Sequence, residues 1–116
     1  MELFYRIFGK PVKSIGPSEG QKRLTQKDKP FLLDVRQPDE YRAGHIAGAK
    51  LIPLNELAQR MNELPDGREI LCVCASGSRS TSATRQLTTA GYSATNLQGG
   101  MGAWSQAGMP VTKGKS

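Results

Sequence analysis

Short apolar runs constrain the fold of this chain more than any other feature of its sequence. Residues 31–35 (FLLDV) and 69–73 (EILCV) are too short for buried helices, and turn signals at Pro30 and Asp66-Gly67 precede them, so both runs predict buried strands. The stretches between such runs place apolar residues at helical spacing. Alternating strands and helices predict an α/β domain with a parallel sheet.

The predicted elements alternate along the chain. Strands are expected at residues 14–15, 31–35, 51–52, 69–73 and 94–97. Helices are expected at residues 17–27, 38–43, 54–64, 79–90 and 101–107. A length of 116 residues fits one domain. We place it at residues 14–111, between an N-terminal appendage (1–13) and a basic C-terminal tail (112–116).

The net charge of +6 lies mostly at the two ends of the chain. The basic residues there are Arg6, Lys10, Lys13, Lys113 and Lys115, against Glu2. Solvated ends explain this surplus better than a nucleic-acid surface, so nucleic acid is not expected as a partner.

No apolar run approaches the roughly 20 residues that a membrane span requires, and the N-terminus lacks the uninterrupted apolar core of a secretory signal. The cytoplasm is therefore the predicted compartment. Leu3, Phe4, Ile7 and Phe8 fall on one helical face, which fits a short amphipathic helix that packs against its own domain or a second copy. Peripheral membrane contact through residues 3–8 is the less favoured alternative.

The segment after the strand at 69–73 carries the most informative chemistry. Cys74 follows this strand directly and precedes a helix, which places it at the carboxyl edge of a parallel sheet, where ligands usually bind. The next four residues are small and let the chain curl, so that their N–H groups and the helix N-terminus can converge on an anion. These loop residues are Ala75, Ser76, Gly77 and Ser78.

Such an environment favours a reactive thiol at Cys74. A helix N-terminus and a nearby cation stabilise the thiolate, and Arg79, which closes the loop, is the candidate cation. The same donors would hold an anionic substrate or a negatively charged persulfide. Cys72, two positions earlier, lies inside the apolar strand and is expected to pack as a small hydrophobe. The pair offers too few ligands for a zinc site.

This loop resembles the active-site loop of the rhodanese family, and the likeness extends in the expected order over about residues 14–111. Asp34-Val35-Arg36 followed by Glu40-Tyr41 is similar to a strand-end segment of the family. Residues 41–52 (YRAGHIAGAKLI) resemble its N-terminal signature, and residues 99–104 (GGMGAW) resemble the closing motif of its single-domain members.

The resemblance implies a central parallel sheet flanked by helices on both faces and sulfur transfer through a Cys74 persulfide. The expected substrates are a small anionic sulfur donor, such as thiosulfate, and a cyanide or thiol acceptor. A protein donor or acceptor is also expected, and no metal or cofactor is required. A sulfur carrier that does not turn over, docking through residues 1–13, is the alternative function.

Two further features refine the expected site. Four residues separate Cys74 from Arg79, whereas cysteine phosphatases and arsenate reductases of similar fold have a loop one residue longer, so those activities are less favoured. Ala75 stands where family members that use thiosulfate often carry a basic or amide side chain, which leaves the donor open. Arg36 is a candidate for substrate contact or for an ion pair with Asp34 or Glu40. His45 is expected to be structural.

Overall fold

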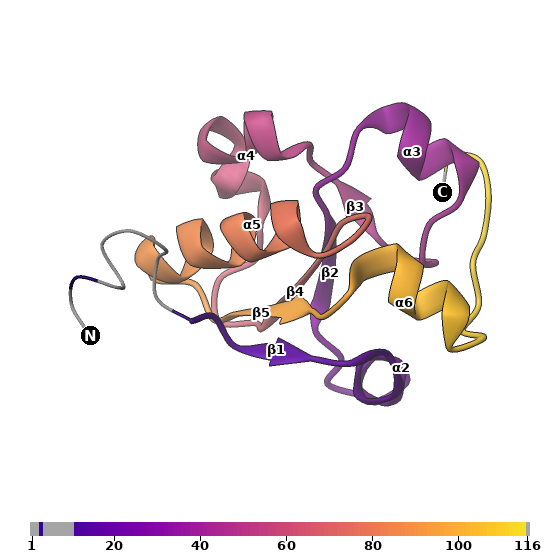
Figure 1. The fold of residues 1–116 in the computed structure, drawn as a ribbon. Coiled ribbons are helices and arrows are strands. Elements are labelled where there is room, and N and C mark those ends of the chain that lie inside the picture. Colours follow the sequence, from indigo (N-terminus) through magenta and orange to yellow (C-terminus); the bar gives the residue numbers. More distant parts are fainter. Residues whose placement is uncertain (1–2, 4–10, 116) are drawn as a thin grey trace.

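The computed structural model of the protein describes Leu3 and residues 11–115. The expected amphipathic face at Leu3, Phe4, Ile7 and Phe8 therefore lies outside the described residues except for Leu3. Five strands form one sheet in the order β1-β5-β4-β2-β3, and every neighbouring pair is parallel (Figure 1). The strands are β1 (Ser14–Ile15), β2 (Phe31–Asp34), β3 (Lys50–Leu51), β4 (Ile70–Val73) and β5 (Ala94–Leu97).

Helices connect successive strands, as parallel pairing requires. The α-helices of the described chain are α2 (Pro17–Leu24), α3 (Pro38–Ala43), α4 (Leu54–Arg60), α5 (Ser78–Thr89) and α6 (Gly100–Gln106). The α/β prediction is confirmed, and most predicted boundaries agree to within one residue.

Two helices end earlier than the sequence predicts. The helix expected at 17–27 stops at Leu24, because the Thr25 hydroxyl turns back and donates to the Lys22 carbonyl at 2.8 Å. The helix expected at 54–64 changes after Arg60 to a short 3₁₀ helix, η1 (Met61–Glu63). Both differences concern the final turn, where helices commonly tighten.

The core consists of two apolar layers, one on each face of the sheet. Alternating residues of the strands supply both layers: in β4, Ile70 and Cys72 face one, and Leu71 and Val73 face the other. The first layer is completed by Leu57 of α4 and by Ala83 and Leu87 of α5. The second is completed by Leu24, Tyr41, Met101 and Trp104, from α2, α3 and α6. The expected covering of both faces by helices is thus confirmed.

The strand order determines which loops meet at the carboxyl edge of the sheet. β4 is the central strand, and β2 is its neighbour with Asp34 paired opposite Val73. The residues that follow these two strands, Val35-Arg36 and Cys74, therefore leave the sheet at the same edge.

The segment after α6 returns to α3. Thr112 and His45 exchange backbone hydrogen bonds of 2.8 Å, and the Gly114 N–H donates to the Arg42 carbonyl at 3.0 Å. The proposed domain boundaries at 14 and 111 remain predictions.

Candidate active site

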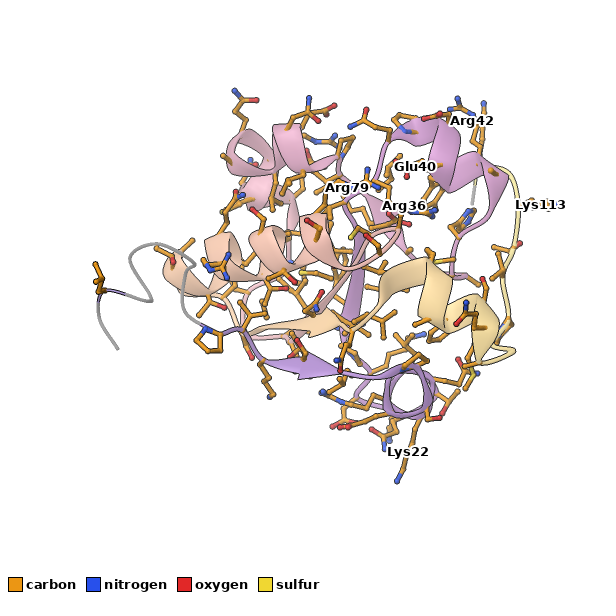
Figure 2. All side chains as sticks on the ribbon, in the orientation of Figure 1. Lys22, Arg36, Glu40, Arg42, Arg79 and Lys113 are labelled. Atoms are coloured by element: carbon orange, nitrogen blue, oxygen red, sulfur yellow. The ribbon has the colours of Figure 1, made fainter. Side chains whose placement is uncertain are left out.

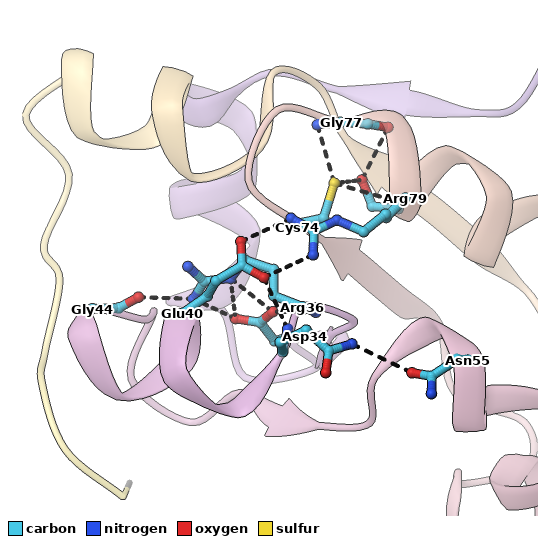
Figure 3. A network of polar contacts seen from close by, with 10 residues as sticks. Asp34, Arg36, Glu40, Gly44, Asn55, Cys74, Gly77 and Arg79 are labelled. Carbon is cyan, nitrogen blue, oxygen red and sulfur yellow. Dashed lines mark hydrogen bonds and ion pairs between the residues drawn. The ribbon is translucent and has the colours of Figure 1, made fainter.

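The loop after β4 wraps around the sulfur of Cys74. Gly77 has φ of +107°, a conformation that favours glycine, and α5 begins at the next residue. This turn directs two backbone N–H groups at the sulfur, from Gly77 at 3.1 Å and from Ser80 at 3.2 Å (Figure 3). The loop thus provides hydrogen-bond donors for a negatively charged sulfur atom.

These hydrogen bonds change the acidity of Cys74. The residue is fully buried, and burial alone raises the pKa of a thiol. Hydrogen bonds from the Ser80 side chain and from the backbone of Ser80, Gly77 and Ser76 outweigh this effect, so the pKa of Cys74 is lowered from its ordinary value. A lowered pKa increases the thiolate fraction at neutral pH, and the thiolate is the nucleophilic form.

Ser80 is a site residue that the sequence analysis missed. Its buried hydroxyl oxygen accepts the Cys74 S–H at 3.3 Å, and the hydroxyl donates to Oδ1 of Asn96 on β5 at 2.6 Å. Asn96 is itself buried, and its amide reaches Ser14 of β1 at 3.3 Å. The signal in the sequence was a hydroxyl residue directly after Arg79, in the first turn of the helix. The contact with Asn96 depends on the pairing of β4 with β5.

Removing the Ser80 hydroxyl should make Cys74 less reactive. When Cys74 ionises, the single proton of the Ser80 hydroxyl turns from Asn96 to the sulfur and stabilises the thiolate. Ser80→Ala removes that hydrogen bond, so the pKa of Cys74 should rise. A hydrogen bond to a charged group contributes about 1.5 kcal/mol, which corresponds to roughly tenfold slower alkylation by iodoacetamide at neutral pH. The rate, measured across pH, gives the thiol pKa directly. Thr88→Ala, at an exposed position near the end of the same helix, is the matched control; an unchanged pKa in Ser80→Ala would contradict this role.

The N-terminus of α6 holds the other side of the loop. The Met101 N–H donates to the carbonyl of Cys74 at 2.8 Å, and the Gly102 N–H donates to that of Ala75 at 3.0 Å. Gly100 lies so close to the loop that an added Cβ would overlap the Cys74 carbonyl oxygen and lie 2.7 Å from that of Ala75. The sequence motif at 99–104 therefore supports the loop, a function that the sequence analysis did not assign to it.

Among the described residues, no hydrogen bond joins the Arg79 guanidinium to the Cys74 sulfur. Nη1 and Nη2 donate instead to the two carboxylate oxygens of Glu40 on α3, at 2.7 and 2.8 Å (Figure 3). The Arg79 hydrogen bond is the largest influence on Glu40 and lowers its pKa to about 2. Arg79 therefore lies at the rim of the loop as one member of an ion pair, and its contact with substrate remains a prediction.

Arg36 is buried at the end of β2 and forms the ion pair with Asp34 that the sequence analysis considered. Nε and Nη2 donate to the carboxylate at 2.8 to 3.1 Å, and Nη2 also donates to the Gly44 carbonyl at 2.7 Å. These contacts support the turn before β3. Contact between Arg36 and a substrate stays a prediction.

The remaining predicted loop residues lie around the sulfur at different depths. Ala75 is partly exposed, Ser76 and Ser78 are exposed, and Gly77 is buried. Cys72 is fully buried in the apolar layer beside α5, and burial raises the pKa of its thiol to about 12. Its expected packing role is thus confirmed, and Cys74 is the more acidic of the two thiols.

His45 lies outside this cluster. Its ring is buried, stacks on Tyr41 with ring centroids 3.7 Å apart, and its Nδ1 contacts the Tyr41 carbonyl at 2.7 Å. These contacts fit the expected structural role. Among the residues that the structure describes, no group of three or more acidic, histidine or cysteine side chains could hold a metal ion. Within the same part of the chain, no helix combines the length and apolarity needed to cross a membrane.

Comparison with known proteins identifies relatives over most of the described chain. The sequence model of the rhodanese-like domain matches residues 17–107. A sulfurtransferase of Allochromatium vinosum is 35% identical over 101 residues, which cover 86% of this chain and 94% of that protein. YrkF of Bacillus subtilis, which is named as a sulfur carrier, is 42% identical over 74 residues, 63% of this chain and 40% of that protein.

Solved structures agree with these sequence relatives. The crystal structure of a rhodanese-like domain protein from Staphylococcus aureus superimposes with a TM-score of 0.81 at 33% identity, covering 90% of this chain and all of that one.

Proposed function

This chain belongs to the family of rhodanese-like domains, and we propose that it is an enzyme that transfers sulfane sulfur through a persulfide on Cys74. The observation that carries the proposal is the convergence of the Gly77 and Ser80 N–H groups on the Cys74 sulfur. Relatives named as sulfurtransferases support a role in sulfur transfer. The catalytic cysteine and its donors and acceptors are our assignment.

In the loading step, the Cys74 thiolate attacks the sulfane sulfur of a donor. A new S–S bond forms at Cys74 while the S–S bond within the donor breaks, and the donor departs as sulfite from thiosulfate or as a thiolate from a persulfide. The rate depends on the acidity of both the attacking and the leaving sulfur. The lowered pKa of Cys74 supports its role as the attacking group at neutral pH.

In the unloading step, an acceptor attacks the outer sulfur of the persulfide. Cyanide or a thiolate forms a bond to that sulfur, and the electron pair of the broken S–S bond returns to Cys74 as thiolate. Hydrogen bonds from the loop stabilise the leaving Cys74 thiolate as its charge develops. The acceptor is oxidised as the Cys74 sulfur is reduced to the thiolate, so the step needs no external oxidant or reductant.

Sulfur transport between proteins without rapid turnover is the second candidate. The resemblance to a protein named as a sulfur carrier favours it. Ala75 also lacks the basic or amide side chain that thiosulfate-using members often carry there, so the identity of the donor stays open. Phosphatase or arsenate reductase activity is less favoured, because the four residues between Cys74 and Arg79 make a smaller loop than those enzymes have.

Donor and acceptor profiling separates the two candidates. We expect Cys74 to accept sulfur from thiosulfate or from a persulfide and to release it to cyanide or a thiol over many cycles. Efficient loading followed by slow release to every small acceptor, and fast release to a partner protein, would favour the carrier. Hydrolysis of an aryl phosphate that is lost in Cys74→Ser would contradict both.

A further inference from the structure

Two ion pairs lie beside the Cys74 loop. Arg79 is the one ionisable side chain between Cys74 and Ser80, and both of its terminal nitrogens are hydrogen-bonded to Glu40. Arg36 is paired with Asp34 in the same way. Figure 3 shows the two pairs next to each other, below the loop that holds the sulfur. Arg79 and Arg36 thus each have a carboxylate partner, and the positive and negative charges of the four side chains balance.

The ion pair between Glu40 and Arg79 persists at neutral pH. Arg79 lowers the pKa of Glu40 to about 2, so the carboxylate remains ionised at neutral pH. The side chains of Glu40 and Arg79 are 31% and 35% exposed, so the pair lies at the surface beside the Cys74 loop. Figure 2 shows Glu40 on α3 and Arg79 on α5, two elements that enclose this rim.

Pairing changes what an approaching anion experiences. An anion near the rim is attracted by the guanidinium and repelled by the carboxylate at a similar distance, so most of the long-range attraction cancels. Thiosulfate carries two negative charges and a simple alkyl persulfide carries one, so the dianion loses about twice as much attraction. The N–H groups of Gly77 and Ser80 still act, but only at hydrogen-bond distance.

We propose that Glu40 is a specificity-determining residue, which neutralises Arg79 and thereby favours singly charged persulfide donors over dianionic thiosulfate. This inference rests on the proposed sulfur-transfer function and narrows the class of its donor. It assigns Glu40 a role beyond helix formation, through the charge at the rim rather than through contact with the reacting sulfur.

Glu40→Gln tests the inference with little structural change. Oε1 of Glu40 accepts the Gln37 N–H at 3.0 Å at the start of α3, and the glutamine carbonyl can keep that bond. The variant removes one negative charge and replaces Oε2 by an NH2 group that cannot accept from Nη2 of Arg79, so the charge of Arg79 is no longer neutralised. Glu19→Gln is the matched control, because Glu19 is exposed on α2, which follows the edge strand β1, whereas α3 leads to the opposite edge strand β3.

In Glu40→Gln, kcat/KM for thiosulfate should rise about threefold or more at low ionic strength, and the gain should shrink as salt shortens the range of the charge. For a monoanionic donor such as hydroxyethyl persulfide, the rise should be smaller. Glu19→Gln should match the wild type with both donors. An unchanged or lower kcat/KM for thiosulfate in Glu40→Gln, with persulfide loading intact, would overturn the inference and leave the proposed function standing.

A second readout does not depend on sulfur transfer. Iodoacetate and iodoacetamide are similar in size and differ by one negative charge, and both must pass the same loop to alkylate Cys74. The ratio of their rates reports the charge at the rim, and we expect Glu40→Gln to raise it about twofold at low ionic strength. Failure of every donor to load Cys74 would contradict the proposed function. An unchanged ratio of the two alkylation rates in Glu40→Gln would contradict the proposed role of Glu40.

Discussion

Replacing Cys74 by serine should abolish sulfur loading and lower the rate of sulfur transfer by at least about 10³-fold, as removal of a covalent nucleophile does in other enzymes. A hydroxyl in the same position cannot form the persulfide that connects the two half-reactions. The change is nearly isosteric, and Cys74 packs against the apolar layer beside α5, so the fold should persist. Rates with thiosulfate and persulfide donors, compared with the circular dichroism spectrum, test this expectation.

Cys72→Ala provides the matched control for Cys74→Ser. Cys72 packs in the same apolar layer as Cys74, but its pKa is raised whereas that of Cys74 is lowered, so its replacement should leave sulfur transfer near the wild-type rate. Its cost should appear in the free energy of unfolding, about 1 kcal/mol for the loss of a small buried group. Loss of sulfur transfer in Cys72→Ala, or retention of sulfur transfer in Cys74→Ser, would contradict the assignment of Cys74 as the nucleophile.

Gly100→Ala should destabilise the domain and inactivate the loop at the same time. Gly100 has φ of +59°, and an added Cβ would meet the carbonyl group of Ala75 at 2.7 and 2.8 Å and overlap that of Cys74. The left-handed conformation and the overpacking together should lower the free energy of unfolding by about 3 kcal/mol, as urea titration would measure. Movement of the backbone would also break the hydrogen bonds from Met101 and Gly102 to the loop.

Gly108→Ala separates the effect of the left-handed conformation from the effect of overpacking. Gly108 follows the same helix, also has a positive φ (+76°), and has open space around its Cα. It should lose only about 1–2 kcal/mol of the free energy of unfolding, from the conformation, and its Cys74 alkylation rate should be unchanged. If Gly100→Ala retained wild-type alkylation kinetics and stability, α6 would have no role in holding the loop.

Local sequence patterns predicted the elements well. The strand at Ile70–Val73 follows from a short apolar run, and the helix after Gly77 follows from apolar residues at helical spacing. Both patterns act within a few residues. The position of Cys74 at the carboxyl edge follows from the same local reading, because a parallel sheet brings strand ends together. Packing of Cys72 followed from its place inside the run.

The parts of the site that the sequence did not predict depend on contacts between distant segments. The Ser80–Asn96 hydrogen bond requires β4 to lie beside β5. The hydrogen bonds from Met101 and Gly102 require the N-terminus of α6 to lie against the loop. The sequence suggested that Arg79 stabilises the Cys74 thiolate. In the structure, Arg79 instead pairs with Glu40, which lies 39 residues away in the sequence. Such pairings are set by topology and side-chain competition, which local patterns do not contain.

The most direct test of the central claim is the intact mass of the protein after treatment with polysulfide. We predict a gain of about 32 Da for one sulfur atom, carried by the peptide that contains Cys74, reversed by cyanide and absent in Cys74→Ser. A gain located on Cys72, or no gain with polysulfide, thiosulfate or an alkyl persulfide, would contradict the persulfide at Cys74.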